Sequence, residues 1–365
     1  MKVVFILGSL HMQRCAKRID EFVEHGYDVD VYAFDRGVNA KKLPKLAEVT
    51  IIGRINKSVG RFGRIWPRIK GVRKVLKKYR KEQVIYYLFG LEMTSMFRVQ
   101  TKRKYIYEES DLVHTYVHNR FIVRLLEWLD IRTIKQSFMT VFTSEGFKQY
   151  HFGENGPENT WIIANRLPTA VTTLPQVGKK SIDMKHLSIG FVGFLRYQSI
   201  YNFAHVFCSS FPELDFHFFG ITGCKEDEEL FEKLKQFGNC HFHGSFSNPN
   251  DLPGIYSQID LVLSTYDVES ENVRYAEPNK IYEAIYFKTP IIVSRGTFLA
   301  DKVNNLGIGY EIDALDNEAI KSFIKSLTEE SIIDKQESID KIGQDYALNI
   351  NDGFFEVLRN KVNEL

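Results

Sequence analysis

Short runs of β-branched and aromatic residues alternate with stretches of helical periodicity along almost the whole chain of 365 residues. This alternation predicts βαβ units, in which helices cover the faces of a parallel sheet. The pattern occurs twice, and a polar stretch at 168–185 separates the two series. We therefore expect an α/β protein with two Rossmann-like domains. The expected strands are 3–8, 28–34, 49–52, 83–88, 104–108 and 138–142, then 188–193, 214–219, 240–242, 259–264, 290–293 and 309–312.

Composition limits the class of protein. The chain is 44% hydrophobic and 26% charged, which is typical of globular proteins and excludes a disordered chain. No apolar run approaches the ~18–20 residues that span a bilayer, and the N-terminal segment has too short an apolar core for a secretory signal. We therefore expect a cytoplasmic protein. The four cysteines show no CxxC spacing, so they indicate neither a zinc site nor a disulfide framework.

The run at 275–294 carries the clearest chemical signal. Pro278 suits the first position of a helix that continues to about Lys288, with Glu277 at its cap. Lys280 and Glu283 are three residues apart and share one helical face. A helix N-terminus attracts a diphosphate, and a carboxylate one turn later can accept hydrogen bonds from two ribose hydroxyls. The alternative is a capped amphipathic helix whose Lys–Glu pair is only solvated surface.

The run PNKIYEA at 278–284, with PII at 290–292 after it, resembles the donor-binding helix of the retaining glycosyltransferases of family 4. The resemblance covers nearly the full length and implies the GT-B architecture, two Rossmann-like domains facing across a cleft. It implies that Glu283 holds the ribose of a nucleotide-sugar donor. One position departs from the family, because Tyr275 stands where many relatives have a second glutamate. Glu269, Glu271 and Asn272 are then candidates for the donor-sugar contact.

The resemblance also implies domain limits. We expect an acceptor-binding domain at 1–168, a donor-binding domain at 187–345, and a C-terminal helix at 346–365 that packs back on the first domain.

A glycine turn after the strand at 188–193 adds a second candidate position for the donor diphosphate. Gly193 permits close backbone approach, and Arg196 can reach a phosphate with its planar fork of donors. Ser199 replaces a lysine that relatives place on the diphosphate, which gives more weight to Arg196 and Lys280 as catalytic cations. Alternatively, Arg196 only covers a strand end. The expected donor-binding residues are Gly8, Gly193, Arg196, Glu277, Asn279, Lys280 and Glu283.

In the first half, the run YIYEESDL at 105–112 is similar to a run in a capsular-polysaccharide subgroup of family 4. Asp111 or Glu109 is expected to orient or deprotonate an acceptor hydroxyl, with help from His114 or His118; capping of the next helix is an equal alternative. The loop at 7–18 resembles the family's N-terminal loop, and its Arg14 and Lys17 are candidates for acceptor phosphate or for plain solvation. Asp28-Val29-Asp30 is like a metal-binding DxD only superficially, so we assign no metal.

The segment at 57–81 carries eleven Lys and Arg and no acid, interleaved with apolar residues at helical spacing from about Pro67. This pattern favours an interfacial membrane helix, because each basic residue near an anionic leaflet contributes ~1 kcal/mol. The net charge of only +2 argues against nucleic acid, and a plain solvated helix stays open. The acceptor and membrane candidates are Arg14, Lys17, Trp66, Arg73, Lys74, Lys77 and Lys78.

Together these features predict a cytoplasmic, peripherally membrane-bound glycosyltransferase of surface or capsular polysaccharide assembly. It would transfer a hexose or related sugar from a nucleoside-diphosphate donor to a lipid-linked, polyprenyl-diphosphate saccharide. Retention of configuration and independence of metal are implied by the resemblance, and no cofactor is expected. Two alternatives stay open: a non-catalytic nucleotide-sugar or glycan binding subunit with the same fold, and a sugar-nucleotide epimerase of similar architecture.

Overall fold

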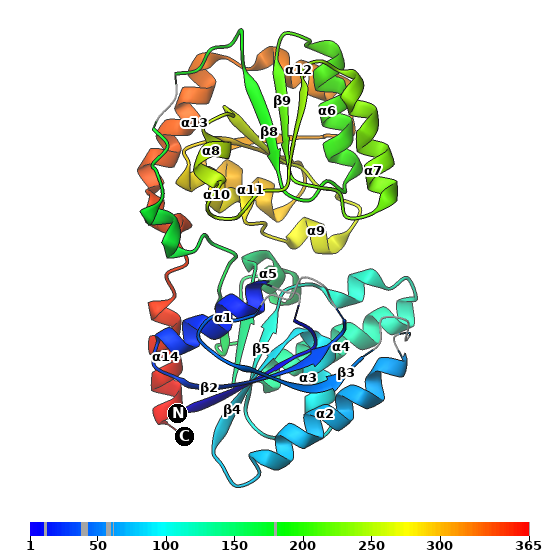
Figure 1. Cartoon of the computed structure of the whole chain (residues 1–365), viewed down its shortest axis with the longest axis vertical. Coiled ribbons are helices and arrows are strands. Elements are labelled where there is room, and N and C mark those ends of the chain that lie inside the picture. The colour runs from blue at the N-terminus through cyan, green and yellow to red at the C-terminus, as the bar shows by residue number, and fades with distance from the viewer. Residues whose placement is uncertain (11–12, 38–42, 56–59, 61, 179–180, 365) are drawn as a thin grey trace. The chain divides into compact units, whose positions relative to one another are not determined.

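The computed structural model describes residues 1–365 except 11–12, 38–42, 56–59, 61, 179–180 and 365. The described chain forms two compact units, drawn in Figure 1. Unit 1 comprises Met1–Ile163 and Asn351–Leu365, and unit 2 comprises Ala164–Ile350. Within the described ranges, no helix has the length and hydrophobicity needed to cross a bilayer.

Unit 1 is built on a seven-stranded sheet in the order β3-β2-β1-β4-β5-β6-β7, with every neighbouring pair parallel. The six expected strands are confirmed, and the seventh, β7, has only three residues and was not predicted. The central strands are buried along their whole length, because helices lie on both faces of the sheet. The strands are β1 Lys2–Leu7, β2 Asp28–Asp35, β3 Val49–Arg54, β4 Val84–Phe89, β5 Tyr105–Glu109, β6 Met139–Phe142 and β7 Thr160–Ile162.

The helices of unit 1 start where capping side chains satisfy their first amides. Asn119 accepts from two backbone N–H groups of α4, and Ser144 accepts from Gly146 N at the start of α5. The helices are α1 Gln13–Glu24, α2 Ile65–Lys78, α3 Gly90–Arg98, α4 Arg120–Gln136, α5 Glu145–Phe152 and α14 Asp352–Asn363, with 3-10 turns η1 Phe62–Arg64 and η2 Val113–Tyr116.

The last helix, α14, completes the core of unit 1. Phe22 of α1 packs edge-on against Phe354 and Phe355 of α14, with ring centroids 6.1 and 5.0 Å away. The His25 ring stacks on Phe355 at 3.7 Å, and His25 Nε2 lies 3.0 Å from Asp352 Oδ1. The aromatic core of unit 1 thus joins segments from both ends of the chain, and the two termini lie in the same unit (Figure 1).

Unit 2 contains a six-stranded parallel sheet in the order β10-β9-β8-β11-β12-β13. All six expected strands are confirmed. They are β8 Ser188–Val192, β9 Asp215–Phe219, β10 Cys240–Gly244, β11 Leu261–Ser264, β12 Ile291–Ser294 and β13 Gly309–Ile312. The helices are α6 Gln198–Ser210, α7 Lys225–Glu232, α8 Leu252–Tyr256, α9 Glu271–Tyr275, α10 Lys280–Tyr286, α11 Phe298–Leu306, α12 Asn317–Ser326 and α13 Glu329–Ile342, with 3-10 turns η3 Thr169–Thr173, η4 Lys233–Gln236 and η5 Gln344–Ala347.

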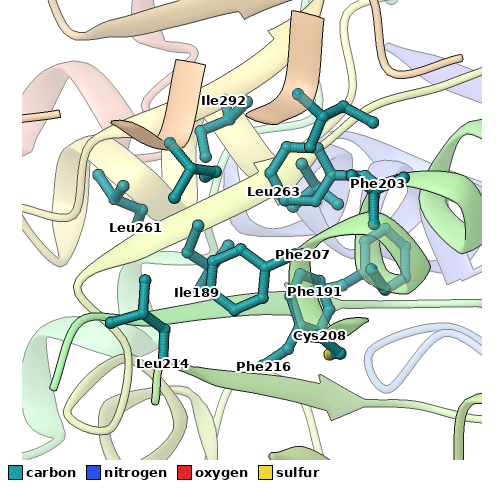
Figure 2. Packing of buried hydrophobic residues seen from close by; sticks show 14 of the residues in the cluster. Ile189, Phe191, Phe203, Phe207, Cys208, Leu214, Phe216, Leu261, Leu263 and Ile292 are labelled. Atoms are coloured by element: carbon teal, nitrogen blue, oxygen red, sulfur yellow. The ribbon is translucent and has the colours of Figure 1, made fainter. Parts of the chain in front are cut away.

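Alternate side chains of each strand fill two separate cores, one on each face of the unit 2 sheet. On one face, Phe203 and Phe207 of α6 pack over Ile189 and Phe191 of β8 (Figure 2). On the other face, α8, α10 and α11 pack over the remaining side chains. Both faces of the sheet are therefore covered, which leaves the strand ends and their turns as the accessible edges.

The predicted limits of α10 were wrong by two residues at each end. The helix begins at Lys280, with Asn279 as its N-cap, and ends at Tyr286; Lys288 adopts a positive φ of 55°. Glu277 is consequently not the cap. Its carboxylate accepts hydrogen bonds from Tyr282 Oη and, at 2.8 Å, from Lys302 Nζ, and these contacts hold the segment before the helix in place.

Candidate active site

Three polar side chains surround the carboxylate of Glu283 in α10, which is fully buried. Lys280 Nζ lies 3.0 Å from Glu283 Oε1 and 2.8 Å from Oε2. Asn279 Nδ2 donates to Oε1 at 2.6 Å, and Tyr256 Oη of α8 donates to Oε2 at 2.8 Å. Lys280 is itself almost completely buried. A buried carboxylate needs this number of donors, because an unpaired charge away from water is costly.

Two glycine turns at the carboxyl ends of β8 and β9 lie against this cluster and against each other. Gly193 and Gly220 have φ of 148° and 149°. A β-carbon at Gly220 would stand 1.8 Å from Gly193 O, so only glycine fits there. A β-carbon at Gly193 would lie 3.7 Å from Lys280 Cε. The Lys280 ammonium group therefore belongs to a helix that borders the Gly193 turn, at the strand edge where open parallel sheets bind ligands.

Arg196 follows the Gly193 turn and is exposed, with its guanidinium 4.8 Å from the centre of the Tyr197 ring. No ion pair of Arg196 occurs within the described ranges, so its charge is available to an anion. Tyr197 packs edge-on against Tyr266, which follows β11. Burial raises the pKa of Tyr266 to about 12, so this phenol stays neutral at physiological pH.

At the start of α6, near Ser199, backbone N–H groups that could bind an anion already donate to a carboxylate. Ser199 is buried, and its backbone N–H donates to Asp267 Oδ1 at 2.9 Å. The neighbouring Gln198 N donates to Asp267 Oδ2 at 3.1 Å. Asp267 therefore caps α6 and holds two of the amides that a diphosphate could otherwise use. The sequence analysis missed Asp267, as well as Tyr256 and Gly220, because no spacing within one segment marks them.

In unit 1 the predicted acceptor cations are mostly committed to other groups. Arg14 Nε lies 3.0 Å from Glu108 Oε1, and Arg18 Nε lies 3.0 Å from Glu108 Oε2. Tyr87 Oη donates to the same carboxylate. Lys17 is half-buried, and burial lowers its pKa to about 8. A β-carbon at Gly8, after β1, would lie 3.2 Å from Met93 Cγ, so Gly8 serves close packing with α3.

Glu109, at the end of β5, lies in a second buried acidic cluster with Asp130 of α4 and His151 of α5. His151 Nε2 is 2.9 Å from Glu109 Oε1, and Tyr107 Oη donates to Asp130 Oδ1 at 2.8 Å. Glu109 Oε2 and Asp130 Oδ2 are buried and find no hydrogen-bond partner among the described residues. Burial raises the pKa of the Glu109 and Asp130 carboxyl groups well above their usual values, and it lowers the pKa of His151. The cluster is therefore close to neutral.

The same three residues are a group with metal-ligand spacing, since one ligand atom from each lies within 4.8 Å of the others. The group fits poorly with the known classes of zinc site. Structural zinc sites have four protein ligands, and catalytic sites with three keep an open position for water or substrate. This cluster offers three ligands in a closed interior. Protonation of the carboxyl groups neutralises the cluster more simply than a bound metal ion would. The donor site contains no comparable set of metal ligands among the described residues.

The remaining predicted positions of unit 1 are dispersed. Asp111 is half-buried, 3.3 Å from Tyr116 Oη, and His114 is buried with Nε2 3.0 Å from Tyr150 Oη. His118 is exposed. Asp30 accepts from Lys2 Nζ at 2.9 Å and from Tyr79 Oη, at the amino end of β2 and away from the strand edge that binds ligands.

Most cations of the α2 helix are exposed, whereas Arg68 of the same helix is buried and paired with Glu92. Arg73, Lys74 and Lys77 are exposed, and so is Lys78, whose Nζ donates to Tyr32 Oη at 2.6 Å. Val72 and Val75 are buried, whereas Trp66 is 69% exposed. The part of the predicted basic segment at 57–59 and 61 lies outside the described residues. Electrostatic attraction is thus available on α2, with Trp66 as its exposed apolar group.

The structure brings Gly193, Asn279, Lys280 and Glu283 together and leaves Glu277 in separate contacts with Tyr282 and Lys302. Residues 178–346 match the family model described as glycosyl transferases group 1. All of the predicted donor-binding residues except Gly8 lie within this matched range. This part of the chain is therefore similar to group 1 glycosyl transferases. The Lys280–Glu283 cluster and both glycine turns lie inside the matched residues.

Solved structures share the whole fold at low sequence identity. HepE from Anabaena, in complex with UDP and glucose, has a TM-score of 0.69 at 14% identity over 98% of this chain and 99% of its own. Sucrose-phosphate synthase from Thermosynechococcus elongatus has a TM-score of 0.72 at 12% identity over 100% of both chains. The lipopolysaccharide outer core galactosyltransferase WaaB has 0.63 at 14% identity over 100% and 97%. These likenesses show the GT-B fold. The comparison with curated proteins gives no match.

Proposed function

We propose that this chain is a retaining glycosyltransferase that moves a hexose or related sugar from a nucleoside-diphosphate donor to a lipid-linked, polyprenyl-diphosphate saccharide in surface-polysaccharide assembly. The observation that carries the proposal is the buried Glu283 carboxylate with its Lys280, Asn279 and Tyr256 donors, inside the residues that match group 1 glycosyl transferases and beside the Gly193 turn. A preformed polar cluster at a strand edge is the kind of site that orients a polar ligand.

Each group in the cluster has a role in this proposal. Glu283 accepts the ribose hydroxyls, and Lys280, which borders the Gly193 turn, shares its charge between Glu283 and the donor diphosphate. Arg196 adds an exposed cation after that turn. As the glycosidic bond breaks, the leaving diphosphate gains negative charge, so fixed cations stabilise the transition state more than the bound donor. No metal is needed for this step.

The comparisons support the same direction. HepE is described with UDP and glucose, which makes a nucleotide sugar the natural donor class for a chain of this fold. WaaB is described as a galactosyltransferase of the lipopolysaccharide outer core, an acceptor carried by a lipid. We place the acceptor side in unit 1, with Asp111 as the candidate near the hydroxyl because Glu109 is inaccessible to solvent, and propose recruitment to the inner face of the plasma membrane by the α2 cations.

One observation favours a different function, a non-catalytic nucleotide-sugar or glycan binding subunit. The Asp267 carboxylate holds the first amides of α6, and the buried Ser199 replaces a cation that would balance the leaving group. Such a protein would bind the donor without strong stabilisation of departing diphosphate. The fold alone does not separate the two, because one fold hosts binding and catalysis alike.

The test is donor turnover. A panel of nucleotide sugars is first screened for thermal stabilisation, and the best donor is then incubated with extracted lipid-linked saccharides while nucleoside diphosphate release is measured. We expect release that requires the acceptor and survives chelation by EDTA. Stabilisation without release identifies the binding subunit, and conversion of the donor sugar without any acceptor identifies an epimerase. Loss of turnover in EDTA, restored by magnesium or manganese, contradicts the metal-free mechanism.

A further inference from the structure

The first nine residues of α4 expose large apolar side chains that a globular protein normally buries. Phe121 is 78% exposed, Trp128 is 53%, Leu125 is 46% and Ile122 is 44%. They recur at spacings of one, three and four residues and therefore follow one side of the helix. Tyr116, in the turn before the helix, is also exposed. Contiguous apolar exposure of this kind marks an interaction surface.

The charges around these side chains are mostly positive. Arg120, Arg124, Arg132 and Lys135 are exposed on the same helix. Of the two acids of α4, Asp130 is buried in the acidic cluster, and Glu127, whose side chain is 33% exposed, accepts from Tyr150 Oη at 3.0 Å. The Arg132 guanidinium stands 5.1 Å from the centre of the Trp128 ring. The surface thus combines exposed aromatic residues and arginines with only one, partly exposed, acid in α4.

The helix is already anchored to unit 1 by its other side. Tyr107 Oη donates to Asp130, Arg98 Nη1 donates to Thr133 Oγ1 at 2.7 Å, and Ile134 is fully buried. Asn119 caps its first turn. The exposed side chains are therefore not needed to hold α4 on the sheet, and they are free to meet another body.

We propose that the α4 face, made of Phe121, Ile122, Leu125 and Trp128 with the flanking arginines, rests in the interfacial layer of an anionic lipid bilayer. Apolar and aromatic groups with basic residues beside them are what an interfacial helix presents to such a layer. The inference deepens the proposed function, on which it rests for the lipid-linked acceptor. It also assigns different roles to two helices. The α4 helix inserts its apolar side chains into the bilayer, and α2, whose valines are buried, supplies electrostatic attraction.

The experiment measures which tryptophan enters the bilayer. In a protein with Trp66→Phe and Trp161→Phe, Trp128 is the one tryptophan left, and vesicles of phosphatidylglycerol and phosphatidylcholine that carry brominated acyl chains should quench and blue-shift its emission. In a Trp128→Phe protein the remaining quenching should be weaker. A second variant, Phe121→Ser with Leu125→Ser and Trp128→Ser, should lower vesicle partition by roughly tenfold or more, because about three side chains of apolar burial are lost.

The matched control is Val99→Ser with Leu315→Ser, which removes exposed apolar groups elsewhere and should leave vesicle partition unchanged. Binding of soluble nucleotide sugar should be unaltered in every variant, which separates this proposal from failure of the proposed function. Unquenched Trp128 together with normal partition of the triple variant overturns the proposal. So does a dimer in solution that the triple variant abolishes, because the occupant of the α4 face is then a second copy of the chain.

Discussion

At the scale of single residues, the adjacent side chains Glu108 and Glu109 show how neighbours decide the state of a buried carboxyl group. Both are inaccessible to solvent. Arg14 and Arg18 each lie 3.0 Å from Glu108, which is therefore balanced by positive charge. Glu109 has His151 and the acid Asp130 as neighbours, and burial raises its pKa well above its usual value. One strand end thus holds an ion pair and a neutral acid side by side.

This contrast gives a pH prediction for Glu109→Gln. A carboxyl group whose pKa is raised in the folded state stabilises the fold below its unfolded value, 4.5, and this stabilisation is lost as pH rises toward the folded value. The variant should therefore lose less stability than the wild type as pH rises above about 4.5, where one proton contributes at most ~1.4 kcal/mol per pH unit. Urea unfolding across this range measures the slope.

The matched control is Glu108→Gln, which removes the carboxylate that Arg14 and Arg18 share and leaves Arg18 with Glu21 as its remaining acidic partner. We expect a loss of about 3–5 kcal/mol at neutral pH, the usual cost of breaking a buried ion pair. Equal behaviour of the two variants would contradict the assignment of a neutral Glu109 beside an ionised Glu108 pair.

The second residue-scale prediction concerns Glu283. Glu283→Ala should weaken donor and free nucleoside diphosphate alike by roughly ten- to a hundred-fold, since a hydrogen bond to a charged group contributes ~1.5–3 kcal/mol. Because the change also strands the buried Lys280 ammonium, Glu283→Gln is the companion variant: it keeps the side-chain size and an acceptor for Tyr256. Calorimetric titration of folded protein measures affinity, and unchanged nucleotide binding in both variants removes Glu283 from the site.

Residue identity in the donor site was only partly predictable. Lys280 and Glu283 are visible because both belong to one short motif. Tyr256 and Asp267 come from other segments, and only the parallel order of β8, β11 and β12 brings the ends of these segments together. Glu277 was wrongly expected at the helix cap, because its contact with Lys302, 25 residues away, has no signature in sequence.

At the scale of elements, the sequence predicted nearly all of the two sheets. Runs such as VVFIL in β1 and IIV in β12 are apolar throughout, the pattern of a parallel strand buried on both faces. The short strand β7 was not predicted, since three residues are too few to show a hydrophobic pattern. The exposure of α4 was not foreseen either, because Phe121, Leu125 and Trp128 recur at the spacing that usually marks a core-facing stripe.

The element-scale prediction tests the charges of α2. Replacement of Arg73, Lys74, Lys77 and Lys78 with Gln should lower binding to anionic vesicles, and wild-type binding should weaken as salt rises, because exposed charges are screened over ~10 Å at 0.1 M salt. None of the four makes an ion pair within the described ranges, and Lys78 donates one hydrogen bond, to Tyr32 Oη, so the fold should be kept. Co-sedimentation with vesicles is the measurement. Binding indifferent to both charge and salt would exclude α2 from membrane recruitment.

At the scale of the whole molecule, the two units differ in how the chain builds them. Unit 2 is one continuous segment, whereas unit 1 needs Asn351–Leu365 to complete its core. Phe354 and Phe355 are fully buried against α1, so α14 is part of the hydrophobic core of unit 1.

The whole-molecule prediction is that Phe355→Ala damages one unit and spares the other. Truncation of a buried phenylalanine costs about 3–5 kcal/mol, which should lower the unfolding temperature of unit 1 alone. The transition assigned to unit 2 should stay in place and should still rise on addition of the donor nucleotide. Differential scanning calorimetry with and without nucleotide separates the two. Loss of nucleotide stabilisation in Phe355→Ala would show that the donor site depends on unit 1.

The split of unit 1 across the chain also fixes an order of events during synthesis. The ribosome makes β1 to β7 first, yet α14 emerges only after every residue of unit 2. Throughout that interval Phe22 and His25 lack the aromatic partners that cover them in the finished protein. The nascent first half therefore exposes an apolar patch while the second half folds. A chaperone that shields this patch until α14 is synthesised would protect the polypeptide from aggregation.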